Sequence, residues 1–313
     1  MRSLFGESNE PMLATSMVGP LLKTKCVLVV DVSNIAHRCW HSPGYKNMSH
    51  NGQQTGHVYG FFRTIDSFVN ASKIRPVSIV YCTDGHAAAR YERYPEYKGN
   101  RDKKYDLVPE VVEVAHLMPG YTVHRDDWEA DDCAGSFVRA LRAREAKEGV
   151  RPAKVMLVTG DKDFEQLLDF EDVYIWTSSK SNPYGPSGIK EAQDPRHIPM
   201  MKAIHGDTSD NIFGIPYFKK KVTAAILPKM EDPLSVDEFV ALAKQECSSR
   251  VYEKVLNYRR KVEDNIFLTR IRTELRLKIR KNRASESKLR GLLQDKYGCS
   301  KLDHSMRRLF GGP

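Results

Sequence analysis

Short apolar runs that end at an acidic residue recur along the first two thirds of the chain. Their length, their β-branched residues and their lack of polar alternation predict strands that are buried on both faces of a parallel sheet. Residues 121–124 and 173–176 are two further candidate strands. The three runs and their acids are 26–30 with Asp31, 77–82 with Asp84, and 155–158 with Asp161.

Stretches with helical spacing of apolar residues lie between these runs, at 58–69, 108–116 and 129–144. Strands that alternate with helices predict an open α/β sheet joined by right-handed crossovers. Ligands of such sheets bind outside the carboxyl ends of the strands. The fold class expected is therefore α/β, with a mainly parallel central sheet flanked by helices, and with the three acids at its functional edge.

The composition changes near residue 196, after which the pattern is helical and strongly basic and shows no clear strand. We expect a flexible extension over 1–24, an α/β domain over 25–200, and a helical, basic region over 201–313. The stretch 270–290 is dense in Lys and Arg, and we expect it to be only partly ordered.

The net charge indicates the kind of partner that the protein binds, and the cysteines indicate the redox state of its compartment. The formal net charge of +9 favours an anionic partner, either nucleic acid or an acidic membrane surface. Six scattered cysteines without a C-x-x-C pair fit a reducing compartment. The first 25 residues lack the apolar core of a signal peptide, and no apolar stretch is long enough to span a bilayer. A cytoplasmic protein without membrane contact is expected.

Acidic residues outside the strand ends complete the candidate site. Each has an ordinary alternative role, because an acid at a helix start commonly caps the helix and an Asp after a strand commonly forms a turn. Taken together, however, acids gathered at one sheet edge would repel one another unless a cation neutralised them. The further acids are Glu129, Asp131, Asp132, Asp163, Asp207 and Asp210.

The expected cation is a hard divalent ion, because the candidate ligands are all carboxylate oxygens and no His–Cys set has zinc spacing. Two Mg²⁺ ions, with Mn²⁺ as a substitute, would activate a water molecule and stabilise a phosphate in transfer. Surrounding Lys and Arg would attract the phosphate backbone that the acids alone would repel.

Four motifs in a fixed order resemble the flap endonuclease or 5′–3′ exonuclease family, especially its small phage members. The resemblance covers roughly residues 26–225. The motifs are Pro95-Glu96-Tyr97-Lys98-Gly99-Asn100-Arg101, Glu129-Ala130-Asp131-Asp132, Thr159-Gly160-Asp161-Lys162-Asp163-Phe164 and Gly206-Asp207-Thr208-Ser209-Asp210-Asn211.

The resemblance implies a 5′-nuclease fold with a role for each motif. By similarity, Asp31, Asp84, Glu129, Asp131 and Asp132 hold one metal ion, and Asp161, Asp163, Asp207 and Asp210 hold the other. Lys98 and Arg101 match the family's cations at the scissile phosphate. The segment near 86–108 resembles the arch through which a 5′ single strand passes.

Basic residues interleaved with tyrosines in that arch segment suit a single strand, with phosphates on the cations and bases on the rings. The alternative for them is a solvated basic loop. The candidates for nucleic-acid contact here are Arg90, Arg93, Tyr97, Lys103 and Lys104.

A helix–turn–helix that grips duplex DNA is expected after Asn211, by the same resemblance. Gly214 fits the family's glycine-rich turn, and Lys219, Lys220 and Lys221 supply charge. Tyr217 and Lys219 stand where glycines are expected, and Tyr and Lys do not offer the close approach and positive φ of glycine. These departures leave the monovalent-ion site of the family open.

The function expected is a structure-selective 5′ nuclease, both 5′–3′ exonuclease and flap endonuclease, in phage DNA replication, primer removal or repair. The expected partners are branched or 5′-flapped DNA or an RNA–DNA hybrid, together with replication proteins, and the expected state is a monomer. The alternatives are a ribonuclease that removes RNA primers and a non-catalytic nucleic-acid-binding scaffold. Retention of every expected acid favours an enzyme over the scaffold.

Overall fold

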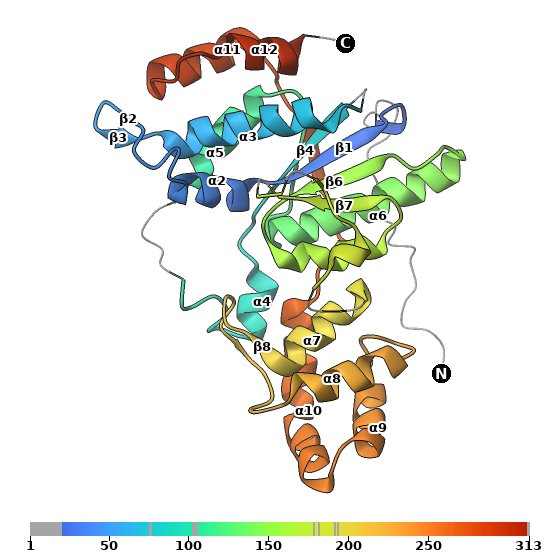
Figure 1. Ribbon diagram of the computed structural model, residues 1–313. Helices are drawn as coiled ribbons and strands as arrows, with labels where there is room; N and C mark the ends of the chain where they lie inside the picture. The colour runs from blue at the N-terminus through green and yellow to red at the C-terminus, as the bar shows by residue number, and fades with distance from the viewer. Residues whose placement is uncertain are drawn as a thin grey trace.

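The central element of the computed structural model is a six-stranded sheet with the order β10-β5-β4-β1-β6-β7 (Figure 1). The structure describes residues 21–74, 77–101, 106–177, 179–180, 182–190, 192 and 194–311. Five strands run parallel and β10 runs antiparallel to β5. The strands are β1 (Cys26–Asp31), β4 (Val77–Thr83), β5 (Tyr121–His124), β6 (Lys154–Val158), β7 (Val173–Trp176) and β10 (Lys278–Lys281).

Every strand expected from the apolar runs is present, as are the three expected helices. All six residues of β1 are buried, and alternate side chains enter two different cores. The expected helices are α3 (Gly56–Ser72), α5 (Val108–Leu117) and α6 (Ala130–Glu148). The α/β prediction, with a mainly parallel sheet, is therefore confirmed.

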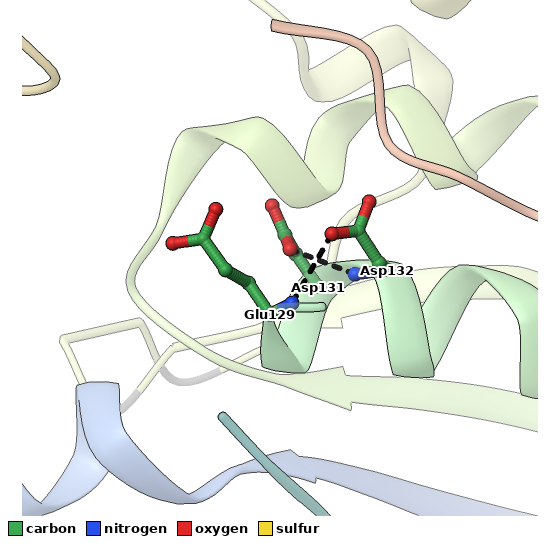
Figure 2. A group of neighbouring side chains, drawn as sticks. All are labelled: Glu129, Asp131 and Asp132. Atoms are coloured by element: carbon green, nitrogen blue, oxygen red, sulfur yellow. Dashed lines mark hydrogen bonds between the residues drawn. The ribbon is translucent and has the colours of Figure 1, made fainter. Parts of the chain in front are cut away.

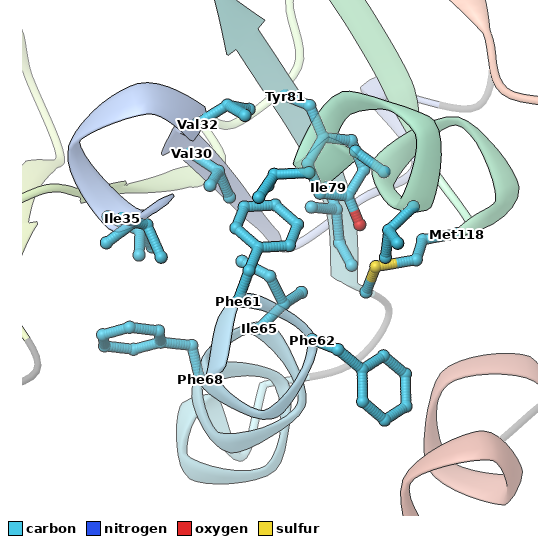
Figure 3. Close-up of a cluster of buried hydrophobic side chains, with 14 of the residues drawn as sticks. Val30, Val32, Ile35, Phe61, Phe62, Ile65, Phe68, Ile79, Tyr81 and Met118 are labelled. Atoms are coloured by element: carbon cyan, nitrogen blue, oxygen red, sulfur yellow. The ribbon is translucent and has the colours of Figure 1, made fainter. Parts of the chain in front are cut away.

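Two hydrophobic cores sandwich the sheet. On one face, Leu28 and Val30 of β1 meet Phe61 and Ile65 of α3, as Figure 3 shows in part. Helices α2 (Val32–His41), α3 and α5 cover this face. On the other face, Val27 and Val29 pack in the core that includes α6 and the 3₁₀ helix η1 (Lys162–Asp169).

A third core lies in a separate group of helices below the sheet in Figure 1. Its helices are α7 (Ile198–His205), α8 (Lys220–Ile226), α9 (Val236–Glu246) and α10 (Ser249–Thr269). A short hairpin of β8 (Gly206–Asp207) and β9 (Ile212–Phe213) follows α7, and α4 (Ala88–Arg93) lies between this helical group and the sheet. A second short hairpin pairs β2 (Ser49–His50) with β3 (Gln53–Gln54).

The expectation that no strand follows residue 196 is wrong. Leu277 and Ile279 are partly buried against the α6 side of the sheet. The alternating residues Lys278 and Arg280 are exposed. This alternation is typical of a half-buried edge strand, but the density of Lys and Arg concealed it in the sequence. After β10, α11 (Glu286–Gly291), the π-helical turn Leu292–Lys296 and α12 (Asp303–Phe310) return to the α3 side of the sheet (Figure 1).

The described part of the expected N-terminal extension, residues 21–24, packs against the body of the protein. Leu21 is buried in the α6-side core, and the hydroxyl of Thr24 is 2.7 Å from that of Ser78. Residues 1–20 lie outside the described residues. Among the described helices, none combines the length and apolarity that crossing a bilayer requires.

Candidate metal-dependent active site

Three acids lie at the carboxyl ends of three neighbouring strands. Asp31 is the last residue of β1, Asp84 follows β4, and Asp161 comes three residues after β6. Because β4 and β6 are the parallel neighbours of β1, their ends share one edge of the sheet. The convergence expected from the strand pattern is what the structure shows.

Asp31 is a buried carboxylate held by local hydrogen bonds. Its Oδ1 accepts a bond of 3.1 Å from the backbone N–H of Asn34 at the start of α2, and its Oδ2 accepts one of 2.9 Å from the Thr159 hydroxyl. Burial, together with the charges of Asp84 and Asp161, raises the pKa of Asp31 to about 8. Its ionised form therefore needs a neighbouring cation at neutral pH.

The first acidic cluster is Glu129, Asp131 and Asp132 at the start of α6. Each offers a carboxylate oxygen within 4.8 Å of the others, and Figure 2 shows the three side chains close together at the first turn of α6. Glu129 and Asp132 form a capping box, so the sequence motif starts the helix as well as gathering charge. Asp84 joins this cluster because its Oδ1 accepts a 2.9 Å bond from the Ala130 N–H.

Asp132 accepts four hydrogen bonds, two on each carboxylate oxygen. It is fully buried; its Oδ1 accepts from Arg90 at 2.9 Å and from the Arg272 N–H at 2.8 Å. Its Oδ2 accepts from Arg90 at 2.5 Å and from the Glu129 N–H at 3.2 Å. Asp131, by contrast, accepts one bond through Oδ1, from the Asp132 N–H, and burial, together with the charge of Asp132, raises its pKa well above the usual range.

The second acidic cluster is Asp163, Asp207 and Asp210, again with carboxylate oxygens within 4.8 Å of one another. Asp161 caps η1 by accepting a 2.9 Å bond from the Asp163 N–H, which fixes the two acids side by side. Asp207 lies in the β8–β9 hairpin, where its Oδ1 accepts from the Ser209 N–H at 2.9 Å. The hairpin therefore brings acids of the helical region to the sheet edge.

Cations from the arch segment connect the two clusters. The ammonium of Lys98 contacts Glu129 of the first cluster and lies 3.8 Å from Asp210 of the second. Arg101 bonds Asp210 at 2.7 Å. Burial works against the charge of Lys98, but Glu129 and Asp210 outweigh it and raise the pKa of this lysine. Both cations thus lie beside the acids, and their contact with a scissile phosphate stays a prediction.

Two residues expected to contact nucleic acid are instead internal. The Arg90 side chain is fully buried, and it bonds Glu129, Asp132 and the carbonyl oxygens of Leu268 and Arg270. A guanidinium with these partners has no surface left for a phosphate, so the prediction for Arg90 is wrong.

The prediction for Tyr97 is wrong for the same reason. Its ring is buried beside Ile212, and its hydroxyl donates to Glu129 at 2.9 Å and lies 3.1 Å from Asp210. Gly214 also has an internal role. A Cβ there would lie 2.3 Å from the Ile204 carbonyl oxygen and 2.4 Å from the Gly206 nitrogen, so packing inside the protein requires glycine at this position, and its contact with a phosphate stays a prediction.

The remaining candidates for nucleic-acid contact are at the surface. Arg93 is half-exposed and pairs with Asp264, and Lys219, Lys220 and Lys221 are exposed at the start of α8. Lys103 and Lys104 fall outside the described residues.

Lys202 is a member of the site that the sequence patterns did not indicate. Its ammonium contacts Asp163 and lies 2.6 Å from Asp207. Burial raises the pKa of Asp207, but the bonds from Lys202 and Ser209 outweigh it and hold that pKa below its usual value. A lysine five residues before an Asp on a basic helical segment carries no recognisable motif, so only the fold could identify it.

The chemistry of the donor set fits divalent metal. Both clusters offer only carboxylate oxygens, which are the ligands preferred by hard cations such as Mg²⁺ and Mn²⁺. Burial first, and neighbouring carboxylates second, raise the pKa of Asp31 and of Asp131, so a bound cation would favour the ionised form of both acids.

A family model described as "5′–3′ exonuclease, N-terminal resolvase-like domain" matches residues 26–194, more than half of the chain. DNA polymerase I of Bacillus caldotenax is 30% identical over 222 residues, which cover 66% of this chain and 23% of that protein. A 5′–3′ exonuclease of Buchnera aphidicola is 26% identical over 220 residues, covering 68% of this chain and 73% of that one. The chain thus spans about a quarter of the length of the polymerase.

Solved structures share the fold at low sequence identity. The bacteriophage T5 5′-exonuclease, in a structure described with bound zinc, superposes with a TM-score of 0.60 at 19% identity, covering 78% of this chain and 89% of that one. Flap endonuclease-1 from Methanococcus jannaschii gives a TM-score of 0.55 at 12% identity, covering 92% and 91%. These likenesses support the fold, including the placement of a helical region after the sheet domain.

Proposed function

We propose, because the chain belongs to the 5′–3′ exonuclease family, that it is a structure-selective 5′ nuclease that acts as a 5′–3′ exonuclease and flap endonuclease. Its substrate is branched or 5′-flapped DNA, cleaved in replication, primer removal or repair. The cofactor we propose is a pair of Mg²⁺ ions, for which Mn²⁺ can substitute.

The observation that carries the proposal is the gathering of carboxylates from distant segments beside two cations. Acids from β1, β4, the start of α6, η1 and the β8–β9 hairpin surround one edge of the sheet. Lys98 and Arg101 lie among them. A structural role explains one or two buried acids, whereas nine at one edge carry more negative charge than the neighbouring Arg90, Lys98, Arg101 and Lys202 balance, which favours a bound cation.

The division of ligands follows the two clusters. Asp31, Asp84, Glu129 and Asp131 would hold one ion, and Asp161, Asp163, Asp207 and Asp210 the other. Asp132 belongs to the first set by position, but its full complement of hydrogen bonds suits the orientation of Arg90 and of the α6 start better than metal contact. Bound ions of this kind activate a water molecule and stabilise charge on the phosphate.

Lys98 and Arg101 have the role of electrostatic stabilisers in this proposal. Their ammonium and guanidinium groups are held at the boundary of the two clusters by Glu129 and Asp210. With metal bound to these acids, the Lys98 ammonium and the Arg101 guanidinium would be free to contact a phosphate oxygen. A well-placed donor in other enzymes lowers the barrier by about 3–4 kcal/mol.

Substrate binding is assigned to exposed cations on two sides of the site. Arg93 lies on α4, within the arch segment 86–108, and Lys219–Lys221 lie at the start of α8 in the helical group. A single-stranded flap near α4 and a duplex near α8 would place the junction at the acids. One neighbour of this fold, the T5 D15 flap endonuclease, is described in complex with DNA and metal ions.

A flap-cleavage assay tests the proposal. The protein is incubated with a labelled 5′-flap duplex in Mg²⁺ and in EDTA, with the 5′ end free or blocked. Metal-dependent release of the flap is expected. Absence of cleavage in Mg²⁺ and Mn²⁺, with DNA binding intact, would favour a binding scaffold. A matched substrate with an RNA 5′ segment measures the preference for deoxyribose or ribose in the cleaved strand.

A further inference from the structure

The turn at residues 215–218 holds a tyrosine in a backbone conformation that favours glycine. Tyr217 has φ of +56°. The Phe218 N–H donates to the Ile215 carbonyl over 3.3 Å, and Pro216 is the second of the four residues. Proline at the second position and positive φ at the third are the pattern of a type II turn, whose third residue is normally glycine or asparagine.

The surroundings of the turn enforce this conformation. Ile215 and Phe218 are both buried in the core of the helical group. The Ile215 N–H donates to the Ile204 carbonyl at 2.7 Å, and Lys254 donates to the Pro216 carbonyl at 3.0 Å. Since both flanking side chains are anchored inward, the side chain of residue 217 is directed outward, and the cost of the left-handed backbone is offset by neighbouring packing.

The ring of Tyr217 is almost entirely exposed to solvent. Tyr217 is 96% exposed, the most exposed of the large hydrophobic residues in the described chain, and Phe213, four residues earlier on the same loop, is 62% exposed. An exposed aromatic ring on a residue whose backbone is in the left-handed region lowers the stability of the isolated protein. Such residues concentrate where a ligand binds.

The charge around the two rings identifies the kind of ligand. Lys219, Lys220 and Lys221 follow the turn directly and are exposed, and the Lys254 ammonium lies 5.7 Å from the Tyr217 ring centroid. Aromatic rings surrounded by lysines are complementary to nucleic acid, with cations on phosphates and rings against bases or sugars. Phe213 belongs to the hairpin that carries Asp207, so backbone pairing connects the first of the two rings to the acidic site.

We propose that Tyr217, with Phe213, is an aromatic contact to the duplex part of the DNA substrate, packing against its sugars while the lysines bind its phosphates. This inference rests on the proposed nuclease function for its substrate. It explains why a tyrosine occupies a turn position that suits glycine. The closer backbone approach that glycine permits is replaced by a side-chain contact.

Replacing Tyr217 by glycine separates this role from a structural one. Tyr217→Gly relieves the left-handed backbone, so the unfolding temperature should stay the same or rise by roughly 2 °C. If the turn served only for backbone approach to phosphate, the glycine variant would bind duplex DNA as well as the wild type or better. If the ring is the contact, the variant should bind about tenfold more weakly.

The experiment measures affinity for a 5′-flap duplex and for single-stranded DNA by fluorescence anisotropy in Ca²⁺ at several salt concentrations. Tyr217→Gly and Phe213→Ala should weaken duplex binding with an unchanged salt slope. Lys220→Ala, the control for a phosphate contact, should reduce that slope by about 0.9. Tyr217→Phe should bind like the wild type.

Duplex affinity of Tyr217→Gly equal to that of the wild type would overturn the inference. A change in self-association of that variant, measured by light scattering, with unchanged DNA affinity would overturn it as well. Failure of the nuclease proposal is distinguishable, because it would show as absent cleavage by the wild-type protein. The binding comparison does not depend on cleavage.

Discussion

Arg90 should be the most sensitive single position for the stability of the site. Its guanidinium makes five hydrogen bonds, two to Asp132, one to Glu129 and one each to the carbonyls of Leu268 and Arg270. Arg90→Leu removes all five and leaves Asp132 as a buried charge without its main partner. Breaking a buried ion pair from one side costs about 3–5 kcal/mol, against a total stability of about 5–15 kcal/mol.

Urea unfolding followed by circular dichroism measures this loss. With an m-value of about 3 kcal/mol/M, a loss of about 4 kcal/mol lowers the midpoint by about 1.3 M. The matched control is Arg93→Leu, one helical turn away on α4. Arg93 is half-exposed and pairs with Asp264 at the surface, a pair worth about 0–1 kcal/mol.

The comparison between the two arginine variants tests whether the buried ion pairs of Arg90 stabilise the protein. We expect the control to shift the midpoint by less than about 0.3 M. In the double variant Arg90→Leu/Asp132→Leu, both buried charges are gone, so part of the lost stability should return. An Arg90→Leu midpoint equal to that of the Arg93→Leu control would refute the view that this buried ion cluster holds α4, α6 and the segment after α10 together.

Three further predictions concern catalysis and pH. Asp163→Asn should abolish flap cleavage while DNA binding in Ca²⁺ survives. Near-normal turnover of this variant would show that Asp163 is not a metal ligand. Lys98→Ala should lower the single-turnover rate by about 10²–10³-fold and the affinity far less; equal losses in both would make it a general phosphate contact. Burial, opposed by the Glu110 hydrogen bond, lowers the pKa of His57 below 6.5. The folded state therefore binds fewer protons than the unfolded state near this pH. As a result, the free energy of unfolding falls as the pH drops through about 6.5. The fall in unfolding temperature between pH 7.5 and pH 5.5 should be smaller in His57→Gln than in the wild type, and identical falls would contradict the assignment.

The strands and their acids could be predicted because one physical cause governs both. A strand buried on both faces must be apolar throughout, and a polar residue can appear only where the strand leaves the core, as at Asp31 and Asp84. The position of Asp161 follows from the same rule. Since the strands are parallel and adjacent, their ends coincide in space, so the strand pattern alone predicts that these three acids gather at one edge.

Residues whose role depends on distant partners could not be predicted in this way. Arg90 looks like a surface arginine of a basic segment, yet its partners lie 39 to 180 residues further along the chain. Lys202 acquires its role only when α7 is placed beside η1. The left-handed φ of Tyr217 is imposed by the burial of its two flanking residues, which outweighs the preference of tyrosine for negative φ.

The central claim, that acids distant in sequence share a pair of divalent cations, is tested most directly by crystals soaked in Mn²⁺. Anomalous difference maps locate the metal without reference to activity. We predict two peaks, one among Asp31, Asp84, Glu129 and Asp131 and one among Asp161, Asp163, Asp207 and Asp210. Manganese peaks only at other positions, or none at these carboxylates at saturating Mn²⁺, would contradict the account.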